Sequence, residues 1–314
     1  MPNLKDKIVS KSVLSLKALV MSLGIAFLFW SLQSSDSEFS MLSNHWQKEP
    51  VVIFKALLIL IFLSFLNWFG EIKKWFHLVG NISFHEATRQ SLISHSLSLL
   101  TPNKLGEYGG KCLFFPKNIS AKIIALTGFG NLSQLFMTLI FGGFGLWFSF
   151  GHLKIYELVQ VKWSWMMLLP LLIVIAFCFK VIRQKLWTVF KSFKKIENSK
   201  VKKTLLWSGF RYVVFAHQFL FLLWCFGAQL NYMNGITTIS LVYLFSSVIP
   251  IFAITDVVVK GSIAVTLMTF AGLPVSMVLV TVFVMWLGNT ILPAVIGYFW
   301  LWSWQSTFIK HKSR

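Results

Sequence analysis

Long apolar segments alternate with short polar ones along the whole sequence. A helix needs about 20 apolar residues to cross the hydrocarbon core of a bilayer, which is roughly 30 Å thick. The polar stretches between the apolar segments are too short for a separate soluble domain, so the pattern predicts an all-α integral membrane protein with one polytopic domain over residues 1–314. The six predicted transmembrane helices lie at about residues 13–32, 51–69, 123–148, 163–180, 204–228 and 275–302.

Two further segments are apolar but interrupted. Residues 86–115 contain a Ser- and Leu-rich stretch followed by a polar, Gly-rich sequence from Thr101 to Lys111, and residues 239–272 contain Pro250. Non-helical backbone within a membrane must be buried in protein or line a cavity, because an unpaired backbone group in lipid costs several kcal/mol. We therefore predict that both segments are re-entrant helical hairpins, each entering and leaving from one face of the membrane.

The distribution of positive charge predicts the orientation. The sequence has 29 Lys and Arg against 10 Asp and Glu, a net charge of +19. With this topology, 24 of the 29 cations lie on the side that holds both termini and the basic loop 180–203, and three lie in the opposite loops. Such a bias places both termini in the cytoplasm and predicts contact with anionic lipid headgroups of the inner or plasma membrane, with no nucleic-acid partner.

The order of predicted elements is the same in the two halves. Residues 1–148 read as span, span, hairpin and span starting inside, and residues 163–302 repeat that order starting outside. An inverted repeat of this kind, with broken helices that meet near the midplane, is typical of secondary transporters. In each hairpin an acidic residue precedes a lysine by four residues, Glu107 before Lys111 and Asp256 before Lys260.

Ionisable and amide side chains inside apolar segments are the candidate substrate-binding residues. Intramembrane acids usually line a pathway or pair with a partner, and lysines near helix ends can hold a phosphate. The alternatives are structural ion pairs or interfacial exposure for the acids, topology for Lys104, snorkelling for Arg211, and helix packing for the amides. His217 and Gln218 could extend the polar face that Arg211 begins. The candidates are Glu107, Lys111, Asp256, Lys260, Arg211, Lys104, Asn131 and Gln134.

Other signals point away from cofactor and metal chemistry. The three cysteines are scattered, and no histidine pair has the HExxH spacing. Gly109-Gly110-Lys111 is not a P-loop, because Leu105 stands where the first glycine is required and Cys112 replaces Ser or Thr. No cofactor and no metal site are predicted.

The first hairpin resembles a known membrane family. Thr101-Pro102, then Gly106-Glu107 with Lys111 four residues on, resembles the first signature of the flippase-like transmembrane family, which includes the membrane domain of lysyl-phosphatidylglycerol synthase. Asn131, Gln134 and the second hairpin are similar to the rest of that domain, so the resemblance covers about residues 10–302. Family members often have paired glycines after the second proline, where this chain has Ala253-Ile254-Thr255-Asp256.

The resemblance implies translocation of a lipid headgroup across the cytoplasmic membrane. The soluble lysine-transferring domain of the synthase has no counterpart in this sequence, so aminoacyl transfer is not implied and the chain is expected not to be an enzyme. The expected partners are membrane lipids with anionic or aminoacylated headgroups. Two alternatives stay open: a membrane enzyme that acts on a lipid-linked phosphate or sugar, and a structural or regulatory membrane subunit.

Overall fold

The computed structural model describes residues 50–99, 101, 104–152, 196–248 and 256–312. This described part is helical and contains no strand, which confirms the all-α prediction for it. The predicted spans at 13–32 and 163–180 lie outside the described residues. The helices are α3 (Pro50–Val79), α4 (Phe84–Ser98), α5 (Leu105–Cys112), the 3-10 helix η1 (Lys117–Ile119), α6 (Ser120–His152), α10 (Asn198–Cys225), α11 (Tyr232–Val248), α12 (Asp256–Phe270), α13 (Val275–Trp286), the π-helix η3 (Leu287–Ile291) and α14 (Leu292–Lys312).

Four of these helices are long and apolar enough to cross a membrane: α3, η1 with α6, α10, and the continuous helix from α13 into α14. They agree with four of the six predicted spans. Two of them, α3 and α10, extend well into residues that were predicted to lie outside the membrane. Helix α3 continues past residue 69 to Val79 and ends before Gly80, which has φ +92°, and α10 begins at Asn198. The end of the predicted loop 180–203 is therefore helical, since no Pro or Gly interrupts Asn198–Lys203.

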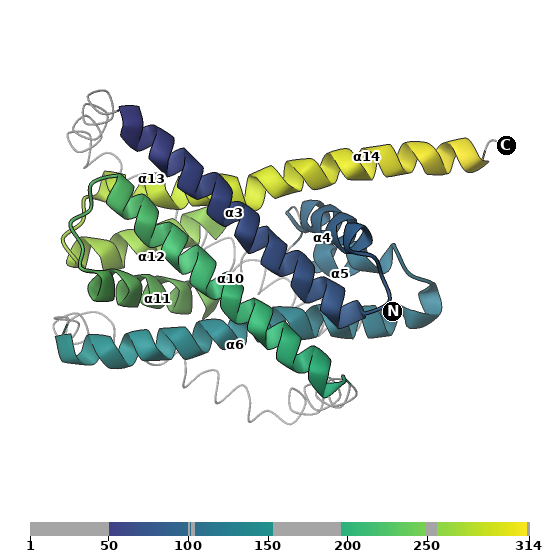
Figure 1. Cartoon of the computed structure of the whole chain (residues 1–314), viewed down its shortest axis with the longest axis horizontal. Coiled ribbons are helices and arrows are strands. Elements are labelled where there is room, and N and C mark those ends of the chain that lie inside the picture. The colour runs from purple at the N-terminus through teal and green to yellow at the C-terminus, as the bar shows by residue number, and fades with distance from the viewer. Residues whose placement is uncertain (1–49, 100, 102–103, 153–195, 249–255, 313–314) are drawn as a thin grey trace, which may run out of the picture.

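Helices α3 and α10 cross in a long antiparallel pair, and α14 extends beyond it toward the C-terminus (Figure 1). Near one end the Lys200 ammonium donates to the carbonyls of Leu78 and Val79, at 3.3 and 3.2 Å. Toward the other end the Gln218 amide donates to the Leu60 carbonyl, at 3.1 Å. The main hydrophobic core lies beside this pair, where α10 packs against α11 and α13.

Small residues let α6 approach α11 closely. A Cβ added at Gly142 would lie 2.7 Å from Cβ of Leu244, and one added at Gly145 would lie 3.0 Å from Cβ of Ser240. Close approach through small residues is the usual way in which helices associate within membranes. Gly142 and Gly145 therefore serve packing of α6 against α11.

Each interrupted segment forms two helices that pack against each other. Helix α4 packs on α5, and α11 packs on α12. The α4–α5 pair sits at the end of the long helices where α3 finishes, and the α11–α12 pair sits at the opposite end, where α10 finishes (Figure 1). The second segment begins earlier than predicted, because α11 starts at Tyr232 and not near residue 239.

A capping box fixes the entry into α4. The backbone N–H of Glu86 donates to the Ser83 hydroxyl at 3.2 Å, and the backbone N–H of Ser83 donates to the Glu86 carboxylate at 2.8 Å. These bonds satisfy two amide groups that a helix start leaves without partners. The backbone and hydroxyl hydrogen bonds from Ser83 hold the pKa of Glu86 below its ordinary value.

Removing the Ser83 hydroxyl should loosen the start of α4. We expect Ser83→Ala to lower the free energy of unfolding by about 1 kcal/mol, because the N-cap bond is lost. Ser83→Asp keeps an acceptor at the cap and should stay close to the wild type. Thermal unfolding in one detergent would measure both variants, and an equal loss in the two would contradict the assignment of the cap.

Candidate functional site

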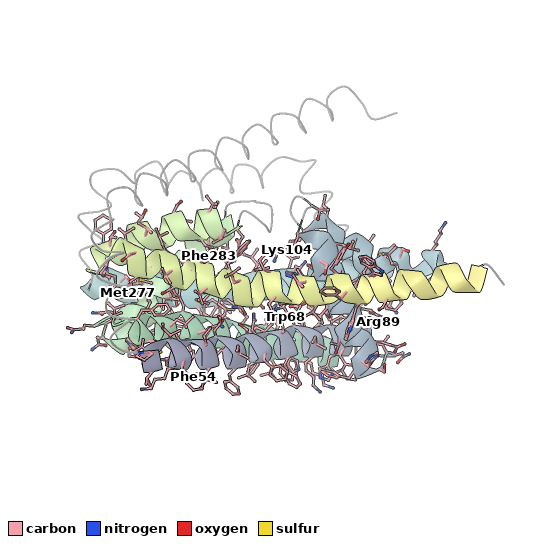
Figure 2. The ribbon with its side chains drawn as sticks, turned by 90° about the horizontal axis from the view of Figure 1, so that it is seen from above. Phe54, Trp68, Arg89, Lys104, Met277 and Phe283 are labelled. Atoms are coloured by element: carbon pink, nitrogen blue, oxygen red, sulfur yellow. The ribbon has the colours of Figure 1, made fainter. Side chains whose placement is uncertain are left out.

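A cavity of about 530 Å³ that contains many charged and amide side chains lies between the long helices and the two broken segments. It lies at the middle of the described helices: Arg211 is at the centre of α10, Gln134 near the centre of α6, and Asn289 at the centre of Val275–Ser303. Figure 2 places Lys104 and Trp68 near the middle of the long axis. The charged and amide side chains that line the cavity are Asn67, Glu71, Lys104, Glu107, Asn131, Gln134, Arg211, Asp256, Lys260 and Asn289.

A buried ion triad forms one wall of the cavity, between α3 and α10. The Glu71 carboxylate pairs with the guanidinium of Arg211 and with the ammonium of Lys74, the latter at 2.7 Å. The Arg211 side chain also donates to the side-chain amide oxygens of Asn67, at 3.0 Å, and of Gln134, at 3.4 Å. Since the side chains of the triad are only 3–17% exposed, its charges are held by fixed protein groups.

The first hairpin contributes a second ion pair. Glu107, in the first turn of α5, accepts a hydrogen bond from Lys111 at 2.7 Å and one from the Asn131 amide at 3.3 Å. The Lys111 ammonium also lies over the ring of Trp75, 4.2 Å from its centroid. Lys111 is therefore buried behind Glu107 and does not line the cavity, unlike the other seven candidates.

The second hairpin contributes a corresponding pair on the other side. Asp256 is the first residue of α12 and pairs with Lys260, one turn later. The side chains of this pair are 25% and 36% exposed, more than those of Glu107 and Lys111 at 13% and 3%. Both hairpins thus present an acid at the start of their second helix, with its lysine four residues on.

A chain of amide groups continues the polar wall to the last helix. The Asn67 amide donates to the Asn289 side chain, and Asn289 donates to that of Gln218, each at 2.8 Å. The Gln218 amide in turn donates to the Ser64 hydroxyl at 2.9 Å. His217 is half-buried and lies 2.9 Å from the Tyr232 hydroxyl, apart from this chain. Neither residue lines the cavity, since Gln218 is fully buried behind Asn289, so the prediction that the two residues extend the cavity is wrong.

The last helix is irregular where it meets the cavity. Pro293 has no N–H to donate to the carbonyl of Asn289, four residues earlier. Asn289 lies within the π-helix η3. The indole N–H of Trp68 donates to that carbonyl at 3.0 Å. Nε2 of His95 lies 3.0 Å from the next carbonyl, that of Thr290, and must carry the proton since a carbonyl only accepts. Short π segments within α-helices are frequent at functional sites.

Several residues of the site were not predicted. Glu71 and Lys74 lie outside the helix that was predicted to end at residue 69, and neither was among the candidates. The available signal was their spacing, because Asn67, Glu71 and Lys74 recur at three and four residues and share one face of a helix. His95 gave no such signal, since its partner lies 195 residues away.

The described residues contain no group of three or more His, Cys, Asp or Glu side chains that could hold a metal ion. They define a helical membrane protein with a charged internal cavity. Comparison of the chain with protein-family models, with curated proteins and with solved structures finds no match.

Proposed function

We propose that this chain is a transporter of membrane lipids that passes a polar headgroup through the central cavity while the acyl chains stay in the bilayer. The observation that carries the proposal is the position of the cavity. Three acids and three of their cationic partners line or adjoin a cavity that also holds Arg211, Gln134 and Asn289 from the centres of the long helices. Ionised side chains are expensive at such a depth and are usually retained for a pathway. The first-hairpin motif that resembles the flippase-like family supports the same function.

We further propose that both broken segments are re-entrant and belong to an inverted repeat. Two features support this: the hairpins lie at opposite ends of the long helices, and each begins its second helix with an acid–lysine pair. Described cations also gather where α3 ends and α6 and α10 begin, at Lys73, Lys117, Lys122, Lys202 and Lys203. That end would face the cytoplasm.

In this mechanism fixed charges replace the water that a headgroup loses when it leaves the membrane surface. Glu107 and Asp256 would accept hydrogen bonds from headgroup donors, and Lys104, Lys260 and Arg211 would interact with its anionic oxygens. Because the protein holds these groups in pairs before substrate arrives, little reorganisation is needed as the headgroup enters. Rocking of one half-repeat against the other would open the cavity to each side in turn.

Translocation in proteoliposomes tests the proposal. Headgroup-labelled lipid should cross the membrane faster in vesicles that contain the wild-type protein than in empty vesicles. Glu107→Gln and Asp256→Asn should each lower that rate at least about ten-fold, the effect of losing one hydrogen bond to a charged group. Glu197→Gln makes the same chemical change on an exposed acid at the start of α10 and should move lipid at the wild-type rate.

The outcome separates the candidate functions. Folded wild-type protein that moves no anionic, zwitterionic or aminoacylated lipid would refute the transport proposal. Transport that persists in both acid variants would refute the role given to the cavity. Folding is checked in each case by size-exclusion profile and thermal unfolding.

A further inference from the structure

We propose that the cavity binds a phosphate anion, so that the headgroup it accepts is net negative and not aminoacylated. That the phosphate belongs to a lipid headgroup rests on the proposed function, but binding of an anion in the cavity can be tested without transport. It is carried by the charge balance of the cavity, by one cavity lysine with no carboxylate partner, and by a buried hydroxyl group with no partner.

Among the described residues, the cavity and the side chains directly behind it hold more cations than anions. The acids are Glu71, Glu107 and Asp256. Against these three negative charges stand five positive ones, from Lys74, Lys104, Lys111, Lys260 and Arg211. Glu107 and Asp256 lie in the two predicted hairpins, and Glu71 lies within helix α3. An excess of two positive charges at mid-depth in a membrane favours an anionic ligand.

The acids are already occupied by cations of the protein. Glu71 binds Lys74 and Arg211, Glu107 binds Lys111, and Asp256 binds Lys260. A cationic headgroup, such as one that carries lysine, would have to displace one of these partners and would raise the positive excess further. A phosphate group lowers the excess and needs no pair to break.

Lys104 is the cavity cation left without a carboxylate among the described residues. It caps the start of α5 with φ +57°, and it is the one non-glycine residue with positive φ in the part of the chain that the structure describes. A non-glycine residue in this conformation is uncommon, and such backbone strain clusters at ligand sites. The conformation places a cation at the N-terminal end of a helix, where anions are favoured.

A second, independent feature lies on α4. The Ser91 side chain lines the cavity, is only 3% exposed as a residue, and has no hydrogen-bond partner for its hydroxyl oxygen. The indole N–H of Trp286, also at the cavity, lacks an acceptor too. A buried donor without a partner is costly unless a ligand satisfies it. Phosphate oxygens accept hydrogen bonds from hydroxyl, indole and ammonium groups alike.

Binding to the full-length protein in detergent tests the site without transport. Inorganic phosphate and a soluble glycerophosphodiester should each raise Tm in a saturable way, relative to chloride at equal ionic strength. Lys104→Asn removes the charge but tolerates the positive φ, and it should weaken binding about ten-fold. Lys104→Arg should bind like the wild type, and Lys202→Asn, which removes an exposed lysine of α10, is the matched control.

Translocation then distinguishes a lipid headgroup from a free anion. In proteoliposomes we expect phosphatidylglycerol to move faster than phosphatidylethanolamine, and both to move faster than lysyl-phosphatidylglycerol. Equal rates, or fastest movement of the lysine-bearing lipid, together with no shift in Tm, would overturn the anion site while transport stands. A Lys104-dependent shift without movement of any lipid would keep the anion site, assign it to a free phosphate and refute the transport proposal.

Discussion

Glu71→Gln is expected to destabilise the protein by about 3–5 kcal/mol, the cost of breaking a buried ion pair by removing one partner. The carboxylate of Glu71 bridges Lys74 and Arg211, and the three side chains are only 3–17% exposed. Glutamine has nearly the same shape, so packing would change little. The loss would come from two cations left buried together without their shared counter-charge.

Thermal and denaturant unfolding in one detergent, with equal lipid content, would measure this effect. Glu197→Gln is the matched control, because Glu197 is exposed at the start of α10, and it should change stability by less than about 0.5 kcal/mol. Adding Arg211→Gln to Glu71→Gln removes one charge of each sign and should recover part of the loss. A stable single variant, or a double variant less stable than the single one, would contradict the account of the triad.

Gly106→Ala should disrupt the first hairpin. A Cβ at this position would lie 2.0 Å from the carbonyl oxygen of Leu97 and 2.5 Å from its carbon, both backbone atoms of α4. Since backbone cannot rotate away as a flexible side chain can, α4 and α5 would have to separate. Overpacking of this kind typically costs 1–3 kcal/mol, and we expect about 3 kcal/mol here. Lipid movement should fall as well, because α5 carries Glu107 and begins directly after Lys104.

Gly109 provides the control on the same helix. An added Cβ there meets nothing within 4 Å, so Gly109→Ala should be neutral or stabilise α5 by roughly 0.5–1 kcal/mol. Unfolding of the two variants in parallel therefore separates a steric effect from loss of glycine flexibility. Equal behaviour of Gly106→Ala and Gly109→Ala would mean that α4 and α5 do not pack as described.

Much of the described fold could be predicted because its signals are local. Long apolar runs set the four candidate spans, and the break near Pro102 and the acid–lysine spacing marked the first hairpin before its contacts were known. Boundaries were less certain. The helix that ends at Val79 was predicted to end at residue 69, because three charged residues follow at Glu71, Lys73 and Lys74. The ion pair of Glu71 with Arg211 on α10, which explains its burial, cannot be read from the sequence.

The candidate site was predictable in part for the same reason. Seven of the eight candidates line one cavity, because ionisable groups in apolar helices turn inward. Lys111 was predicted to bind substrate but is buried behind Glu107 and does not line the cavity. Sequence periodicity gives the face of a short helix on which a side chain lies, but not how deeply that side chain is buried. The chain from Asn67 through Asn289 to Gln218 depends on partners 71 and 222 residues apart, which no local pattern contains.

The irregular turn in the last helix has a mechanical consequence. Its first part, α13, packs on α12 and α10, and its second part, α14, packs on α4 of the first hairpin. One continuous helix therefore joins the two half-repeats that would have to rock against each other in the proposed mechanism. Any relative rotation must be absorbed at the π segment, where Trp68 and His95 hold the carbonyls of Asn289 and Thr290. If the two units rock as proposed, these two hydrogen bonds would resist bending of the helix at this point.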